Sequence, residues 1–188
     1  MDDRRNPYED VAAPGIEVRV DRRMRVAALR HMNTQGIFAR QCKNTFGVAL
    51  PEALRAVEVP GAPAGHQCIL AWRQPTQTLA LVSDGEAYAN LLAELSPTED
   101  GCCVDQSGGL WVLRLSGARV PDLLLRIGNA ASVVSPGQAH VSRIAELTVL
   151  ALCIKAGETL LLLDRAYVEH LLGWIRVTAA DLDIGTGG

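Results

Sequence analysis

The chain has 188 residues, of which 48% are hydrophobic and 21% charged, and its formal net charge is −3 at pH 7. This is ordinary globular usage, which excludes extensive disorder except at the ends. An acidic balance without clustered Lys and Arg argues against binding to duplex nucleic acid. Residues 1–10 lack the apolar core of a signal peptide, and no run of about eighteen apolar residues occurs, so we expect a cytoplasmic protein without a membrane span.

The cysteines are an odd number and show no C-x-x-C spacing. This usage is typical of a reducing compartment with small buried thiols rather than of a disulfide framework. The sequence therefore predicts free thiols, and the cysteines are Cys42, Cys68, Cys102, Cys103 and Cys153.

Both ends of the chain are charged or rich in glycine. We predict a flexible N-terminal arm over residues 1–16 and a flexible tail over residues 181–188. Between them, residues 17–180 are predicted to form a single compact α+β domain with two lobes, over about 17–106 and 107–180.

Arginines alternate with apolar residues over 18–30. The alternation predicts one long strand with a solvated face, and an RNA-binding patch is the alternative interpretation. A helix is predicted over 37–47, because apolar residues recur there at helical spacing and Gly47 is a plausible stop. Residues 57–65 are rich in Pro and Gly and predict a connection.

A hairpin is predicted next, with strands over 67–72 and 78–82. Ser83 and Asp84 offer capping oxygens for a following helix, which Pro97 closes. Two further strands are predicted, joined by a turn that contains Gly108 and Gly109; they lie over 102–105 and 110–115.

The last third of the chain begins with a helix predicted over 118–127, for which Ser116 is a reasonable N-cap. A final helix is predicted over 165–175, with Asp164 placed to cap it. The strands between these two helices are predicted over 139–144, 147–154 and 159–163.

The helical segments recur about 80 residues apart: Gly36 and Gly47 bracket one helix, and Gly117 and Gly128 bracket another of the same length. We interpret this as a weak internal duplication in which each half is a strand-helix-strand-strand-helix unit, although similar helices could produce it by chance. The predicted fold class is α+β, with two fused ferredoxin-like lobes of mixed antiparallel sheets and helices packed on them.

The sequence contains no G-x-G-x-x-G after a strand and no G-x-x-x-x-G-K-[ST], so phosphate cradles for nucleotides are missing. The four histidines stand far apart, without partners at metal-ligand spacing. Neighbouring Cys102 and Cys103 would point to opposite faces of a strand, and neither Ser107 nor Ser116 has G-x-S-x-G spacing. No catalytic, cofactor-binding or metal-binding residue is therefore predicted on this chain.

The best candidate for a subunit interface is the segment Arg30, His31, Met32 and Asn33, which combines basic, titratable, flexible apolar and amide side chains at a predicted strand end. Trp72 is a further interface candidate, because Trp is enriched at binding hot spots. Core packing is the alternative interpretation for Trp72, and also for Trp111 and Trp174.

Several short motifs point to one family. Residues 104–107 have a Val-Asp-x-Ser pattern, residues 113–117 have Leu-x-Leu-Ser-Gly, and the last predicted helix ends in Trp174 and Ile175. With the upstream segments FGVALP and LAW, most of residues 20–177 resembles the γ subunit of heterotetrameric sarcosine oxidase. That family belongs with the folate-binding domain of the glycine-cleavage aminomethyltransferase, so the resemblance implies aminomethyltransferase-like lobes.

The resemblance also implies a complex of four different chains that demethylates sarcosine or another N-methyl amine. In such complexes the α and β chains carry FAD, FMN and NAD, a small δ chain binds zinc, and tetrahydrofolate can accept the one-carbon unit. The γ chain binds none of these cofactors. The expected partners are thus α, β and δ subunits, and the chain itself is expected to do no chemistry.

Residues 73–79 (RQPTQTL) depart from the usual Gly-Pro-Asp-Glu-Trp-Leu-like stretch of the family, which leaves the substrate open. An alternative is a stand-alone folate-binding or iron–sulfur-assembly protein of the same wider fold, whose Lys-Gly-Cys-Tyr-x-Gly-Gln-Glu motif is absent. A third possibility is an aminomethyltransferase, for which Asp105 is the nearest candidate carboxylate, although a turn Asp more often accepts local hydrogen bonds.

Overall fold

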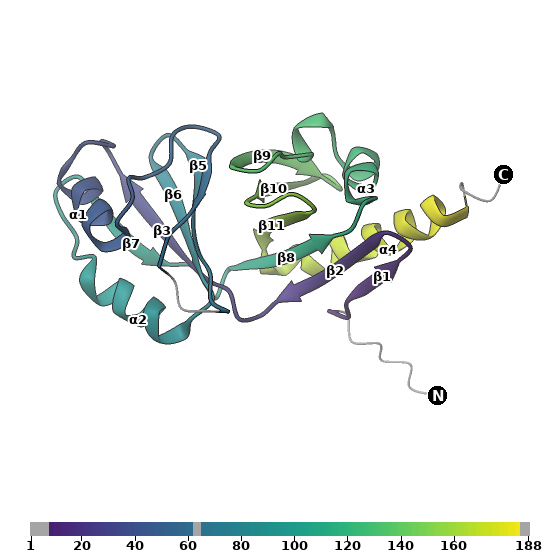
Figure 1. Ribbon diagram of the computed structural model, residues 1–188, viewed down its shortest axis with the longest axis horizontal. Coiled ribbons are helices and arrows are strands. Elements are labelled where there is room, and N and C mark those ends of the chain that lie inside the picture. The colour runs from purple at the N-terminus through teal and green to yellow at the C-terminus, as the bar shows by residue number, and fades with distance from the viewer. Residues whose placement is uncertain (1–7, 62–64, 185–188) are drawn as a thin grey trace.

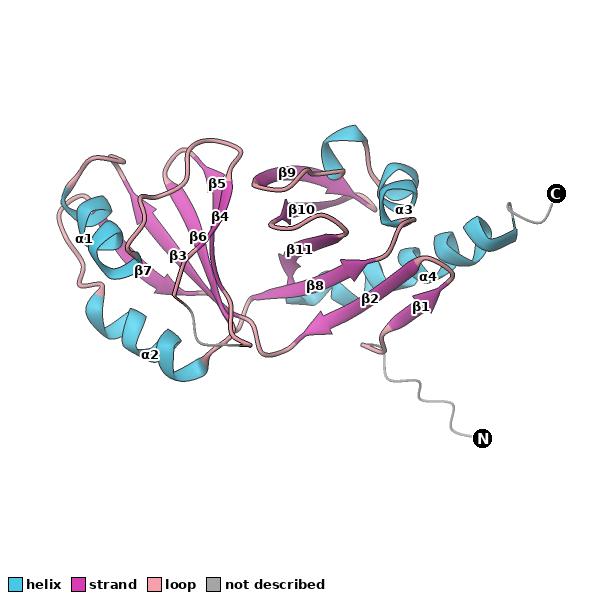
Figure 2. Ribbon diagram, in the orientation of Figure 1, coloured by secondary structure: helices cyan, strands magenta, loops and turns pink. Residues whose placement is uncertain are grey.

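The computed structural model describes residues 8–61 and 65–184. Two antiparallel sheets pack face to face, and each sheet is covered on its outer side by two helices, as the two halves of Figure 1 show. The predicted α+β class with two lobes is confirmed, with the helices at the outer flanks and the sheets between them (Figure 2).

The first sheet has the strand order β4-β5-β6-β3-β7. Helices α1 (Ile37–Phe46) and α2 (Gly85–Glu94) cover its outer face. The strands are β3 (Arg25–His31), β4 (Ala56–Glu58), β5 (Cys68–Gln74), β6 (Gln77–Val82) and β7 (Gly101–Asp105).

The second sheet has the strand order β1-β2-β8-β11-β10-β9. Helices α3 (Val120–Ile127) and α4 (Val168–Ile184) cover its outer face, with the short 3₁₀ turns η1 (Ala130–Ser132) and η2 (Arg165–Tyr167) before β9 and α4. The strands are β1 (Val11–Ala13), β2 (Ile16–Asp21), β8 (Leu110–Ser116), β9 (Gln138–Ile144), β10 (Leu147–Cys153) and β11 (Glu158–Asp164).

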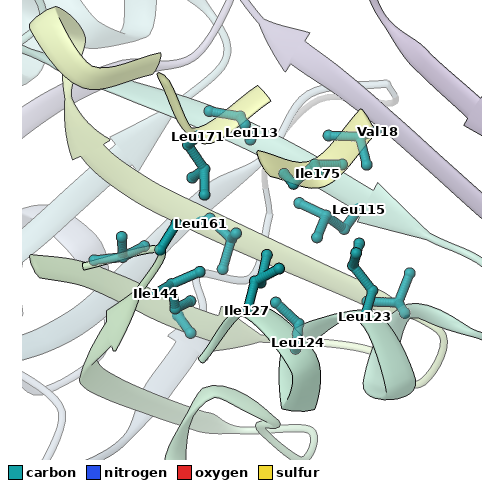
Figure 3. Close-up of a cluster of buried hydrophobic side chains, with 14 of the residues drawn as sticks. Val18, Leu113, Leu115, Leu123, Leu124, Ile127, Ile144, Leu161, Leu171 and Ile175 are labelled. Atoms are coloured by element: carbon teal, nitrogen blue, oxygen red, sulfur yellow. The ribbon is translucent and has the colours of Figure 1, made fainter. Parts of the chain in front are cut away.

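Three apolar layers hold these elements together. One layer lies between the two sheets and includes Leu81 from β6 and Leu160 from β11. The other two lie between each sheet and its helices, and Figure 3 shows the layer under α3 and α4. Because both faces of the central strands are covered, β6 is buried at every position, which explains its continuous apolar run.

The predicted long strand over 18–30 is wrong. The chain turns at Arg22 and Arg23, so that β2 joins the second sheet and β3 joins the first. Likewise, β7 and β8 are consecutive strands in different sheets and do not form a hairpin. The residues of both connections are compatible with a local turn, and only long-range pairing decides which sheet each strand enters.

The expected duplication is visible in the topology. One unit runs from β2 to α2 and the other from β7 to α4, and each places two helices at equivalent points. The two sheets match in strand order when β4-β5-β6-β3-β7 is aligned with β9-β10-β11-β8-β2. The first strand of each unit pairs in the sheet of the other unit: β2 lies beside β8, and β7 lies beside β3. The lobes are therefore not contiguous in sequence, in contrast to the expected lobes over 17–106 and 107–180.

Several expected boundaries also shift. Val11–Ala13 and Ile16, which fall in the expected arm, are strand residues, and α4 continues into the expected tail as far as Ile184. Ser116 ends β8 instead of capping a helix, since α3 begins at Val120. The remaining parts of the predicted arm and tail, 1–7 and 185–188, lie outside the described residues. None of the described helices is long and apolar enough to cross a membrane.

Candidate functional site

The predicted interface segment lies where β3 ends and the chain turns toward α1. Here a cavity of about 470 Å³ opens, and Arg30, His31 and Met32 contribute to its wall. The other lining residues come from the β5–β6 turn on one side of β3 and from β7 and the loop before it on the other; they are Gln74, Thr76, Gln77, Thr98, Glu99, Asp100, Gly101 and Cys102. The sheet thus brings together three segments that are far apart in sequence.

Asp100 fixes the shape of this corner. Its carboxylate accepts hydrogen bonds from the Phe38 backbone N–H at 3.0 Å and from the Thr98 hydroxyl at 2.7 Å. These hydrogen bonds, with Thr98 first, lower the pKa of Asp100. The N-cap position of α1 is Gly36, which has no side chain, so Asp100 supplies the missing acceptor from a distant loop.

Gly36 makes room for that carboxylate, since a Cβ at this position would lie 1.6 Å from the Asp100 Oδ2 atom. Gly101 likewise leaves no room for a side chain. A Cβ at this position would lie 2.6 Å from the Phe38 ring and 2.5 Å from the Arg30 carbonyl oxygen. The turn into α1 is therefore held by close packing as well as by hydrogen bonds.

His31 is buried, with 3% of its surface exposed. Its Nε2 lies 3.4 Å from the Thr78 hydroxyl, and its Nδ1 has no hydrogen-bond partner. Burial lowers the pKa of His31, and the nearby Asp100 charge opposes this shift only in part. The side chain is thus almost inaccessible to solvent, although it borders the cavity, and its contact with a partner chain stays a prediction.

The other predicted interface residues are placed differently. Met32 is 80% exposed, and the Arg30 side chain is also exposed. Asn33 is exposed in a tight turn, in which its side-chain oxygen accepts from the Gln35 N–H at 2.8 Å. Trp72 is half-buried on β5 and does not line this cavity. Contact of these residues with a partner chain stays a prediction.

Arg73 is a residue that the sequence interpretation did not single out. It is partly buried at the end of β5 and lines a second cavity, a groove of about 480 Å³ between the two lobes. Burial, followed by the charge of Arg30, lowers the pKa of Arg73. The floor of the groove is apolar, with Leu79, Leu150 and Leu162, and the exposed Tyr167 stands at its rim.

The arginine-rich segment before β3 contributes to a third depression, of about 600 Å³. Arg114 also lines it and binds Asp21 at 3.0 Å, the Gln67 side chain at 2.9 Å, and Glu158. The guanidinium therefore ties β8 to both neighbouring strands and to the first lobe. Arg114 thus has a structural role. Among the arginines over 18–30, for which an RNA-binding patch was the alternative interpretation, Arg19 forms an ion pair with Glu17.

Asp105, the candidate carboxylate, is part of a local network. It accepts a 2.6 Å hydrogen bond from the Tyr88 hydroxyl and a 2.8 Å bond from the Ser107 N–H. The Tyr88 oxygen also lies 2.9 Å from the Val26 carbonyl oxygen. The Tyr88 bond lowers the pKa of Asp105, while burial and then this bond raise the pKa of Tyr88. The Val-Asp-x-Ser pattern thus joins α2, β3 and β7.

The cysteines are free thiols. Burial raises the pKa of Cys68 and Cys103 to about 11 and that of Cys42 to about 12, so these thiols stay protonated near neutral pH. Within residues 8–61 and 65–184, no group of three or more His, Cys, Asp or Glu side chains could hold a metal ion.

The remaining tryptophans have separate environments. Trp111 packs against Tyr8 with ring centroids 5.1 Å apart, and the Arg165 guanidinium lies 5.1 Å from the Trp111 ring. Trp174 on α4 is 49% exposed, so it is not a core residue of this chain. The core interpretation therefore does not hold for Trp174.

Comparison with known proteins identifies related folds. A chain of the heterotetrameric sarcosine oxidase from Corynebacterium sp. U-96, solved in complex with pyrrole 2-carboxylate, superposes with a TM-score of 0.77, 19% identity and 96% coverage of both chains. The glycine cleavage system aminomethyltransferase T from Bartonella henselae gives a TM-score of 0.62 and 17% identity, with 94% of this chain covering 52% of that one. No curated protein sequence matches the chain.

These structures define the class of protein as a two-lobed α+β chain with an aminomethyltransferase-like fold. Residues 30–181 match the family model described as the sarcosine oxidase, gamma subunit family. The chain belongs to this family, and the resemblance drawn from its motifs is confirmed.

Proposed function

We propose that this chain is the non-catalytic γ subunit of a heterotetrameric, sarcosine oxidase-like flavoenzyme. The complex demethylates sarcosine, or a related N-methyl amine, to glycine by oxidation. The other products are hydrogen peroxide and either formaldehyde or 5,10-methylenetetrahydrofolate. The observation that carries the proposal is the match of residues 30–181 to the gamma subunit family.

The proposal includes α, β and δ chains as partners and a cytoplasmic location. FAD, FMN, NAD, zinc and tetrahydrofolate are assigned to those partner chains. The similarity in fold to a chain of a heterotetrameric sarcosine oxidase over 96% of both chains is consistent with such an assembly.

A non-catalytic role is supported by the surroundings of the carboxylates and thiols that could otherwise take part in catalysis. Asp100 holds the start of α1, and Asp105 binds Tyr88 and the Ser107 N–H. Burial keeps the thiols of Cys42 and Cys103 protonated. Each group therefore has a structural use that requires no reaction.

Stand-alone folate binding is the second candidate, and the groove between the lobes is the observation that favours it. Its volume of about 480 Å³ falls in the range of small-molecule sites, and apolar side chains form its floor. Calorimetric titration of the isolated chain with tetrahydrofolate separates the two candidates, because the γ-subunit proposal expects no binding at micromolar concentrations.

Leaving this chain out of the co-expressed complex tests the proposal. The chains encoded next to this one are co-expressed with and without it, and sarcosine-dependent hydrogen peroxide formation and flavin content are measured. Omission should lower both, whereas an assembled complex that carries Asp105→Asn should retain its activity. Full activity and full flavin content in the absence of this chain would contradict the proposal.

A further inference from the structure

Two arginines of the first sheet stand close together without a counter-charge. Arg30 in β3 is paired in register with Gln77 in β6, and Gln77 is paired with Gln74 in β5, next to Arg73. The two arginines thus flank Gln77 at the same end of the sheet. Among residues 8–61 and 65–184, no side chain forms a hydrogen bond or an ion pair with either guanidinium.

Three of the four carboxylates that line the two cavities are bound to other groups. Asp100 binds the Phe38 N–H and Thr98, and Asp164 accepts from the Ala166 N–H at 2.8 Å. Glu146 is paired with Arg143 at 2.9 Å. Glu99, on the rim of the first cavity, is exposed and makes no ion pair with either arginine. Within the described part of the chain, no carboxylate is therefore in ion-pair contact with either arginine.

This arrangement is unfavourable in the isolated chain. Arg73 is partly buried, and the charge of Arg30 acts on it with the same sign, which lowers the pKa of Arg73. By contrast, Arg114 meets two carboxylates and Arg143 meets one. A carboxylate brought in from outside would stabilise both guanidiniums at once, and arginine is well suited to bind a carboxylate through two parallel hydrogen bonds.

The surroundings indicate a protein partner. Arg30 and Met32 line the same cavity, and Met32 is 80% exposed, although a long apolar side chain gains nothing from solvent. Met and Arg are both enriched at protein interfaces. The exposed Arg30 is accessible to another chain, and Arg73 lies deeper, in the groove.

We propose that Arg30 and Arg73 form a docking site for an acidic side chain of a partner subunit, with Met32 packing beside it. This inference rests on the proposed function, because the partner is another chain of the same complex. It adds the chemistry of the contact: one carboxylate, presented on a segment that enters the corner between β3, β5 and the loop before β7.

Charge reversal tests the site. Arg30→Glu and Arg73→Glu are each introduced into the chain, which is co-expressed with its partner chains, and the dissociation constant of the purified chain from the complex is measured. Arg126→Glu, an exposed arginine on α3, is the matched control. Each variant at the site should bind about 30-fold more weakly or worse, as expected for disruption of a buried charge contact. The control should bind like the wild type.

A stability measurement excludes misfolding as the cause. Since the two arginines repel each other, Arg73→Glu and the neutral Arg73→Gln should unfold at a temperature equal to or higher than the wild type as isolated chains. Weaker assembly with undiminished stability supports the docking site. Wild-type assembly by both charge-reversal variants overturns it while leaving the proposed function intact, and failure of the wild-type chain to assemble overturns both.

Discussion

Among single residues, those of the Val-Asp-x-Ser motif connect separate secondary-structure elements through hydrogen bonds. The Tyr88 hydroxyl reaches Asp105 at 2.6 Å and lies 2.9 Å from the Val26 carbonyl oxygen, so one side chain of α2 connects two strands of the first sheet. Tyr88 is 6% exposed, which makes the loss of these partners costly.

Tyr88→Phe should therefore lower the free energy of unfolding by about 1–2 kcal/mol, because the hydrogen bonds disappear while the ring still fills its place. Denaturant unfolding followed by circular dichroism measures the change. Tyr167→Phe is the control, since Tyr167 is 51% exposed, and it should unfold like the wild type. Equal stability of the two variants would show that the network does not stabilise the fold.

His31 makes stability depend on pH. Burial lowers its pKa in the folded chain below the unfolded value near 6.5. Protonation therefore favours the unfolded state, so the contribution of His31 is fully present above pH 6.5 and decreases as the pH falls from 6.5 toward the folded pKa. The nearby Asp100 has a lowered pKa and titrates in a more acidic range.

His31→Gln should accordingly lose less stability than the wild type between pH 7 and pH 5.5, whatever its stability at neutral pH. Unfolding free energies at both pH values measure the difference. His170→Gln, at an exposed position of α4, should keep the wild-type slope. The same slope in all three proteins would mean that His31 is not the responsible group.

At the scale of elements, helix ends were predictable where the capping group is local. Gly47 ends α1 with a left-handed φ of 70°, and Asp84 caps α2 through the Glu86 and Ala87 N–H groups. The start of α1 was not predictable in the same way, because its capping carboxylate comes from Asp100 in a distant loop. Sequence spacing carries no signal of such a contact.

Gly36→Ala should destabilise the chain by about 1–3 kcal/mol, since the new methyl group would displace the Asp100 carboxylate from the start of α1. Thermal unfolding measures the loss. Gly85→Ala is the matched control, because a Cβ at this first position of α2 meets no atom within 4 Å. If both variants unfold at the same temperature, the Asp100 contact does not hold the helix.

Most of the longer strands were predictable from alternation and apolar runs, but the short strands β1 and β4 and the sheet to which each strand belongs were not. Nothing in Arg22 or Arg23 distinguishes a turn within one sheet from a crossing between two. The surroundings of Arg73 were not predictable either, because the sequence shows it only as part of a hairpin turn. Its proximity to Arg30 depends on the register of β3 with β6, and the paired residues Arg30 and Gln77 are 47 positions apart.

At the scale of the whole molecule, the two units are joined by exchange of a strand. β2 pairs with β8, β7 pairs with β3, and an apolar layer lies between the sheets. Each lobe therefore depends on a segment from the other half of the sequence. The two sheets are therefore linked both by strand pairing and by a shared apolar layer.

Native mass spectrometry can show whether this chain is a bound subunit of an oxidase complex. The tagged chain is co-expressed with its genomic neighbours, purified under gentle conditions and weighed. We expect one assembly that contains four different chains, including this one. Elution of the chain alone, as a stable monomer of 20.2 kDa, would contradict it.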